Sequence, residues 1–116
     1  MRREHRLRAN ADFQRIRHKG PTQVHPLLVM ATLPNGLEHS RFGFAVGRRI
    51  GKAVTRNRIK RRMREAVRAR MQRDEIAAGW DVLFIARHPV RGASFHQVDE
   101  AIGLVLRRAG LVSEAL

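Results

Sequence analysis

The side chains most often used for catalysis or metal binding are scattered along this 116-residue chain. The six histidines occupy positions 5, 18, 25, 39, 88 and 96, without the H-x-H or H-x-x-x-H spacing that brings two imidazoles to one metal. Four acids form adjacent pairs, Asp74 with Glu75 and Asp99 with Glu100, and neighbours on a helix point about 100° apart. Such pairs do not converge on a metal or a water. We therefore predict no catalytic residue, no metal site and no tightly bound cofactor in the protein itself.

The segment GRRIGKAV, residues 47 to 54, superficially resembles a phosphate-binding loop. Three residues separate Gly47 from Gly51 where a P-loop has four, and Ala53 stands where Ser or Thr would bind magnesium. These differences exclude nucleotide hydrolysis by such a loop. We expect the two glycines to end a strand and to shape the turn into a helix, whose first backbone amides would still lie near a phosphate.

One cluster of functional side chains does stand out, because it is strongly basic. In TRNRIKRRMRE, residues 55 to 65, six of eleven residues are Arg or Lys. Residues 41 to 73 hold thirteen basic residues and a single acid, Glu65, and a smaller basic block lies in residues 1 to 20. The whole chain carries a formal net charge of +14. This charge repels itself in a compact chain unless a polyanion or salt neutralises it, so a nucleic acid is the expected partner.

Length and composition favour one domain, residues 1–116, because 116 residues with 43% apolar content are too few for two cores. The chain has no cysteine, which excludes disulfides and Cys-ligated zinc and is consistent with a cytoplasmic location. No apolar run approaches the roughly 20 residues of a membrane span, and the basic N-terminus leads into no signal-peptide core. We expect no membrane partner and no obligate protein partner.

The elements that position the basic cluster alternate between helix and strand. A first helix is predicted at about residues 10–19. The apolar runs 26–33 and 41–47 are joined by the turn-rich PNGLEHS and are typical of a hairpin, with a short extra strand near TQVH. The basic helix is predicted at about residues 56–72 and a further strand at 80–86.

The last helix has the clearest sequence signals. A capping box of Ser94 with Gln97 begins it and Gly110 ends it. The apolar residues expected on one face are Phe95, Val98, Ile102 and Val105. The complete order α-β-β-β-α-β-α predicts a single-domain α+β sandwich, in which helices pack on a central sheet of about four strands.

The basic helix is predicted to have two opposite faces. Its inward stripe consists of Ile59, Met63, Ala66 and the aliphatic stem of Arg70, with Val67 at the edge. Its outward ridge consists of Asn57, Arg61, Arg64 and Arg68, flanked by Lys60 and Arg56. Like charges at these spacings destabilise an isolated helix by roughly 0.2 to 0.5 kcal/mol per pair. The ridge therefore favours an anionic partner over the alternative of a merely solvated helix face.

The motif GRRIGKAVTRNRIKRRMRE, residues 47 to 65, closely resembles the signature of the bacterial ribonuclease P protein subunit. That signature is a pair of basic residues, Ile or Val, Gly, then Ala-Val-x-Arg-Asn-Arg-x-Lys-Arg. RLRANADFQRIRHKG resembles the N-terminal helix of the family, RFGFAVGRR the strand before the motif, and DVLFIARHPV the strand after it. The resemblance covers most of residues 5–110. It implies a left-handed β-α-β crossover around the basic helix, whereas most such connections are right-handed.

The resemblance also implies a function in which the protein is not the catalyst. In this family a large RNA subunit, which holds most of the bound Mg2+, cleaves precursor tRNA and releases its 5′ leader, and the protein assists. The basic face of the motif would lie against this catalytic RNA. By position the motif residues are Arg48, Arg49, Lys52, Arg56, Asn57, Arg58, Lys60, Arg61 and Arg64, and helical geometry alone adds Arg68.

A second binding surface is implied between the first helix and the sheet, where the family binds the single-stranded leader. Phe13 matches an aromatic residue of this cleft, and a base stacked on it would contribute roughly 1 to 3 kcal/mol. Packing of Phe13 against Ile16 in the core is the alternative. Where many members have another aromatic one turn later, this chain has Arg17. Guanidinium stacking or a phosphate contact by Arg17 would make leader binding more salt-dependent.

Two other classes of function are compatible with parts of the sequence. A structural RNA-binding protein, such as a ribosomal component with no role in cleavage, would explain the charge equally well, but the motif argues against it. A self-sufficient nuclease would need converging acids, histidines or a metal, and the sequence shows no such constellation.

Overall fold

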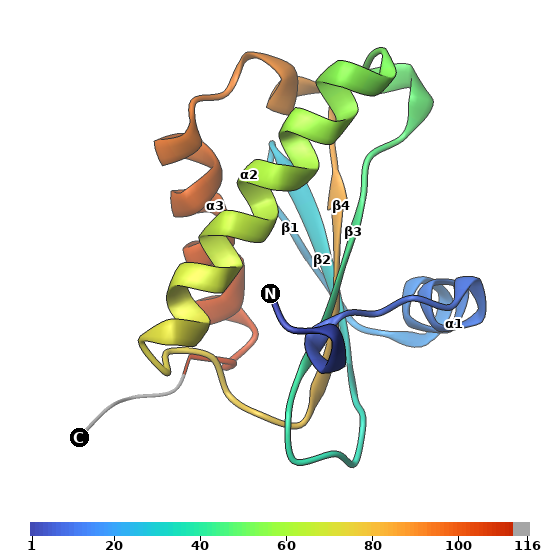
Figure 1. Cartoon of the computed structure of the whole chain (residues 1–116), viewed down its shortest axis with the longest axis vertical. Helices are drawn as coiled ribbons and strands as arrows, with labels where there is room; N and C mark the ends of the chain where they lie inside the picture. The colour runs from blue at the N-terminus through green and yellow to red at the C-terminus, as the bar shows by residue number, and fades with distance from the viewer. Residues whose placement is uncertain (113–116) are drawn as a thin grey trace.

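The alternation of helices and strands produces three layers. The structure is a computed structural model that describes residues 1–112. A four-stranded sheet forms the middle layer, with α1 (Asn10–Lys19) on one face and α2 (Ala53–Gln72) and α3 (Phe95–Arg108) on the other (Figure 1). The strands are β1 (Thr22–Val24), β2 (Leu28–Pro34), β3 (Arg41–Ala45) and β4 (Trp80–Ala86). Short 3-10 turns are η1 (Arg3–His5), η2 (Arg48–Ile50) and η3 (His88–Gly92). The predicted α+β sandwich and its element order are confirmed.

The strand order is β1-β2-β4-β3, so β4 lies between two strands that precede it in the chain. It pairs antiparallel with β2 and parallel with β3, which makes α2 the connection of a β-α-β unit. The predicted hairpin between residues 26–33 and 41–47 is therefore wrong. The physical reason is that Val82, Leu83 and Phe84 are buried on both faces of β4, which requires a central position. The hairpin partner of β2 is β1, the short strand expected near TQVH.

Two hydrophobic clusters of very different size join the layers. The larger one lies between the sheet and the two long helices and includes Met30, Phe42, Phe84, Met63 and Ile102. The smaller one lies beneath α1 and consists of Leu7, Ile16, Ala31 and Leu83. Ile16 is the one buried residue of α1. This helix is therefore attached to the sheet by much less apolar surface than α2 or α3.

The basic helix α2 begins at Ala53, three residues before its predicted start at about residue 56, and ends at Gln72. Its buried residues are Ile59, Met63, Ala66 and Val67, which confirms the apolar stripe. Arg70 in that stripe turns its guanidinium toward α3. Its Nη1 binds the carboxylate of Asp99, and its Nη2 donates to the Asp99 carbonyl oxygen at 3.0 Å. Arg70 therefore links the two helices instead of facing the sheet.

The predicted capping box begins α3. The Ser94 hydroxyl accepts a hydrogen bond from the Gln97 backbone N–H at 3.1 Å, and the Gln97 side chain accepts one from the Ser94 N–H at 2.9 Å. Val98, Ile102 and Val105 are buried as expected, but Phe95 is 41% exposed. The prediction for Phe95 is wrong because the buried face of α3 begins one turn later, at Val98.

Candidate nucleic-acid interface

The segment between β3 and α2 brings the basic motif to the surface. Ile50 is buried in the larger cluster and anchors η2, while Arg48 and Arg49 are exposed. The N-cap residue of α2 is Lys52, whose side chain makes no capping hydrogen bond, and the first turn of α2 contains no acidic residue. The first N–H groups of α2 and the positive end of its dipole therefore lie among cations, an arrangement that favours a phosphate.

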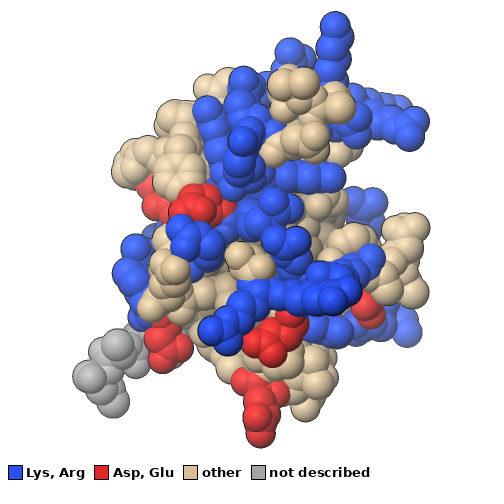
Figure 2. Space-filling model, in the orientation of Figure 1, with Lys and Arg blue, Asp and Glu red and all other residues tan. Residues whose placement is uncertain are grey.

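The outward side of α2 continues this basic surface. Asn57, Arg58 and Arg61 are exposed, and Lys and Arg side chains gather over α2 in the view of Figure 2. Their neighbour Arg62 points the other way, since its Nη1 donates to the carbonyl oxygen of Ala93 at 2.8 Å. Arg56 is partly buried, and its Nε lacks a hydrogen-bond partner within residues 1–112. Helical periodicity thus separates basic residues that are adjacent in the sequence.

Arg68, at the far end of the predicted ridge, is engaged within the protein. Its Nε donates to the Glu65 carboxylate at 3.0 Å, and its Nη2 binds the other oxygen of the same group. This pair raises the pKa of Arg68 and lowers the pKa of Glu65. A phosphate approaching Arg68 would have to compete with Glu65, so the structure favours Arg61 over Arg68 as a phosphate contact.

Lys60 and Arg64 lie on the flank of α2 that faces β3. The guanidinium carbon of Arg64 is 5.9 Å from the centre of the Phe44 ring, and Phe44 stacks on Phe84 with ring centres 5.7 Å apart. A guanidinium over an aromatic face contributes roughly 0.5 to 1 kcal/mol at exposed sites and restricts its orientation. The predicted ridge is therefore not a single row, because Arg64 leans toward the edge of the sheet.

A cleft of about 790 Å³ opens between α1, the ends of β3 and β4, and the start of α2. Its floor is apolar and includes Ala45, Ile85 and Ala86. Its rim is polar or cationic and includes Arg17, Arg48, Arg49, Lys60 and His88, while Phe13 and Phe44 line its walls. This combination suits a single strand of nucleic acid, because the bases can contact the floor and the phosphates can contact the rim.

A smaller hollow of about 200 Å³ extends this cleft along the edge of β3. Both spaces are lined by Phe13, Phe44 and Lys60, and the smaller one adds Arg6 and Arg64. The second basic block predicted from the sequence, residues 1 to 20, therefore supplies Arg6 to the same path. The N-terminal segment reaches this edge because the Leu7 N–H donates to the Phe42 carbonyl oxygen at 2.9 Å.

Phe13 has two environments at once. It packs with Ile16 on the smaller cluster, and its ring lies so close to β3 that a Cβ added to Gly43 would be 2.3 Å from the Phe13 Cε1 atom. It is still partly exposed and lines both hollows. The cleft and core interpretations of Phe13 are therefore compatible with each other.

Phe44 and His88 also line the cleft but are not among the residues predicted from the sequence. Phe44 alternates with Phe42 in RFGFAVG, and this pattern indicates a strand without distinguishing a core side chain from one at an open edge. His88 follows β4 by two residues and has no spacing signal toward any other polar residue. The structure brings Arg48, Arg49, Lys60, Phe13 and Arg17 together around the cleft and leaves Asn57, Arg58 and Arg61 on the outward face.

A depression of similar volume, about 780 Å³, lies over α3 and η3. Its lining includes the carboxylates of Asp99 and Glu100 beside Arg107, so its charge is mixed and less suited to a polyanion. Within residues 1–112, no three His, Asp or Glu side chains converge as ligands of a metal ion would. Over the same residues, no helix has the length and apolar character needed to cross a membrane.

Comparisons with known proteins agree on one family. The sequence model described as Ribonuclease P matches residues 1–110. The chain is 43% identical to the ribonuclease P protein component of Herpetosiphon aurantiacus over 96% of this chain and 89% of that protein. It is 44% identical to the component of the same name from Roseiflexus castenholzii, over 100% of this chain and 94% of that protein.

Solved structures show the same likeness. The RNase P protein of Staphylococcus aureus superposes with a TM-score of 0.84 at 34% identity, covering 94% of this chain and 98% of that one. The RNase P protein of Thermotoga maritima gives a TM-score of 0.78 at 33% identity, covering 88% of this chain and 96% of that one.

Proposed function

Since the chain belongs to the ribonuclease P protein family, the protein components of an RNA-based endoribonuclease, we propose that it binds a catalytic RNA subunit and the 5′ leader of precursor tRNA. In this way it assists the endonucleolytic maturation of the tRNA 5′ end. The observation that carries the proposal is the placement of the exposed basic face of α2 directly beside a cleft with an apolar floor and a cationic rim. The basic face of α2 suits a folded RNA, and the cleft suits a single strand.

The outward face of α2 is assigned to the catalytic RNA. Exposed guanidiniums can reach phosphates of a folded RNA without entering its narrow major groove, and such contacts position the protein without reading sequence. The uncapped start of α2 adds backbone N–H donors to the cations of residues 48–52. Each phosphate contact releases counterions, so assembly should weaken steeply as salt rises.

The cleft beside α1 is assigned to the leader. Only unpaired nucleotides can place their bases on the apolar floor formed by Ala45, Ile85 and Ala86, because paired bases are stacked inside a duplex. Mature tRNA lacks the leader and would lose these contacts. The protein would then favour precursor over product, which increases specificity for the substrate before any bond is broken.

Cleavage is assigned to the RNA subunit and its Mg2+, in the cytoplasm. The protein contributes binding, orientation and neutralisation of phosphate charge, which reduces the repulsion between two large RNAs. Its own side chains hold the leader in place beside the RNA and have no assigned role in proton transfer.

The test is cleavage of a labelled precursor tRNA at low Mg2+ by the protein alone, by a bacterial ribonuclease P RNA alone, and by the two together. We expect efficient cleavage only in the mixture, at the mature 5′ end. Cleavage by the protein alone would show an active site within the chain. A protein that binds the RNA without stimulating cleavage would instead be a structural RNA-binding protein.

A further inference from the structure

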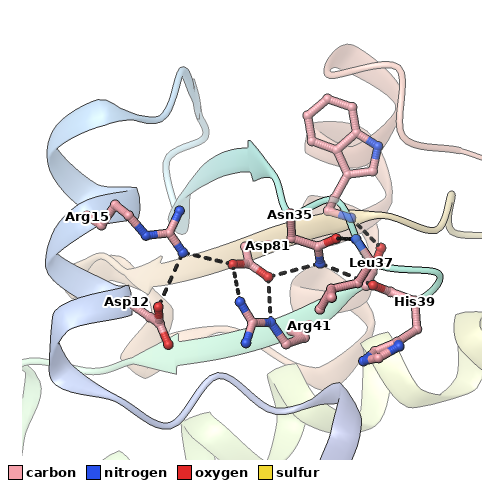
Figure 3. Close-up of polar contacts among 9 residues, drawn as sticks. Asp12, Arg15, Asn35, Leu37, His39, Arg41 and Asp81 are labelled. Carbon is pink, nitrogen blue, oxygen red and sulfur yellow. Dashed lines mark hydrogen bonds and ion pairs between the residues drawn. The ribbon is translucent and has the colours of Figure 1, made fainter.

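A fully buried carboxylate lies at the opposite end of the sheet from the cleft. Asp81, near the start of β4, is 0% exposed, and Figure 3 shows three donors converging on it. Its Oδ1 accepts from Asn35 Nδ2 at 3.1 Å and from Arg41 Nε at 2.8 Å. Its Oδ2 accepts from Arg41 Nη2 at 2.7 Å and from Arg15 Nη2 at 3.0 Å. Arg15 also reaches Asp12 at 3.3 Å.

These contacts join four parts of the fold through one side chain. Arg41 comes from β3, Asn35 from the β2–β3 connection and Arg15 from α1. Arg41 with Asn35 already gives the buried carboxylate three hydrogen bonds and a compensating charge, which is what a buried acid requires. The contact with Arg15 is additional. It is also a polar link between α1 and β4, one of the two inner strands of the sheet.

The position of Arg15 on α1 determines what this link can do. Residues at i+2 on a helix lie about 200° apart, so Arg15 is on the flank opposite to Phe13 and Arg17, which line the cleft. Ile16 lies between the two flanks and faces the sheet. Asp81 and Ile85 are four residues apart on β4, a separation of about 13 Å along the strand. Arg15 therefore binds Asp81 at one end of β4, and the cleft opens toward the other end.

A helix held mainly by one buried side chain can rotate about its own axis unless both flanks are fixed. On the cleft flank the fixed contact is the Phe13 ring against Gly43. On the opposite flank it is the Arg15 guanidinium on the Asp81 carboxylate. We propose that Asp81 is a positioning residue for substrate binding, which acts through Arg15 to hold α1 at the orientation that presents Phe13 and Arg17 to the leader. The inference rests on the proposed function of the cleft.

The test compares leader recognition by holoenzymes reconstituted with a bacterial ribonuclease P RNA. Arg15→Met removes the link but keeps an unbranched side chain, and it leaves Asp81 bonded to Arg41 and Asn35. Lys19→Met is the matched control, because Lys19 is an exposed cation of the same helix that does not line the cleft. For each protein the Kd is measured for a precursor tRNA with a leader and for the same tRNA without one, together with the Kd for the RNA subunit.

We expect Arg15→Met to reduce the leader-dependent gain in affinity by about threefold to tenfold, the effect of weakening a single base contact. Lys19→Met should change that gain by less than about twofold, and neither variant should change RNA-subunit binding by more than that, since distant sites act independently. Arg15→Lys, which can still donate to Asp81, should restore most of the gain. In a background that already carries Phe13→Ala and Arg17→Ala, Arg15→Met should have almost no further effect, because both side chains that it positions have been removed.

Each other outcome contradicts a defined part of the reasoning. If the unmodified protein shows no leader-dependent gain, the assignment of the cleft fails and this inference fails with it. If the gain is present but Arg15→Met leaves it unchanged, only the positioning role is overturned. Equal losses of the leader-dependent gain in Arg15→Met and Lys19→Met would show that the net charge of α1, and not its orientation, determines the affinity for the leader. Additive losses in the triple variant would show that Arg15 does not act through Phe13 and Arg17.

Discussion

Two adjacent arginines of α2 allow a direct test of which side of the helix contacts RNA. Arg61 is exposed on the outward face, whereas Arg62 donates to the Ala93 carbonyl oxygen at 2.8 Å. Arg61→Ala and Arg62→Ala make the same chemical change and remove the same charge, one residue apart. We expect Arg61→Ala to weaken binding of the RNA subunit with little effect on folding, and Arg62→Ala to destabilise the fold with little effect on the salt dependence of binding.

The expected magnitudes follow from the surroundings of the two residues. Loss of one phosphate contact makes the negative slope of log K against log[salt] shallower by about 0.7 to 0.9, which weakens binding about fivefold at 0.15 M salt. Arg61→Ala should change the free energy of unfolding by less than about 0.5 kcal/mol, as for other exposed sites. Arg62→Ala leaves the carbonyl oxygen of the buried residue Ala93 without the charge-assisted hydrogen bond that Arg62 donates. This loss should lower the free energy of unfolding by about 1.5 to 3 kcal/mol.

The assay is a titration of the RNA subunit with each protein between about 50 and 200 mM salt, over which the ratio of wild-type to Arg61→Ala affinity should shrink about threefold. Urea unfolding of the free proteins provides the stability measurement. An unchanged slope for Arg61→Ala together with a reduced slope for Arg62→Ala would refute the assignment of the outward face. Parallel slopes in all three proteins would remove this part of α2 from the interface.

Three further predictions concern the cleft and the buried acid. Phe13→Ala should lower the preference for leader-bearing precursor by at least about fivefold while the protein still assembles with the RNA, as measured by paired Kd values; simple unfolding of the domain would leave Phe13 only a core role. Gly43→Ala should have a similar effect without removing the ring, because its Cβ would lie 2.3 Å from the Phe13 Cε1 atom and displace it; an unchanged leader preference would contradict this. Burial raises the pKa of Asp81, but hydrogen bonds from Arg41, Asn35 and Arg15 outweigh it and hold the pKa below the ordinary value of 3.8. The folded pKa is the lower one, so this stabilisation is present above about pH 4 and is lost as the pH falls through the folded pKa. Asp81→Asn should cost roughly 3 to 5 kcal/mol at neutral pH and flatten the acid limb of the stability curve in urea unfolding; an unchanged acid limb would show that Asp81 is not the group responsible.

The features that could be predicted from the sequence depend on short spacings. The apolar stripe of Ile59, Met63 and Ala66 follows from a repeat of three to four residues, and the Ser94 and Gln97 capping box from an interval of three. The basic cluster and the expected negative charge of its partner follow from composition and need no coordinates. The resemblance of residues 47 to 65 to a known motif identified the family, which the comparisons confirm.

The predictions that failed involve contacts between distant parts of the chain. Residues 26–33 and 41–47 have the alternation and the turn residues of a hairpin, and nothing local shows that β4 will come between them. The burial of both faces of β4 decides that order, and burial is a property of the whole packed domain. Phe95 failed for the same reason, because periodicity gives the face of a helix but not the point at which the neighbouring layer begins.

The sequence by itself determined the charge, because charge is a sum over residues. It also determined the faces of the basic helix and the order of the elements, because residues at most four positions apart specify them. Only the tertiary structure decided that Phe13, Phe44 and Lys60 share one cleft, since they lie on three different elements. It also decided the partners of Asp81, because Arg41 and Arg15 are 40 and 66 positions away in the chain. Those contacts form when the sheet assembles, and their geometry depends on strand order and helix orientation that no local pattern encodes.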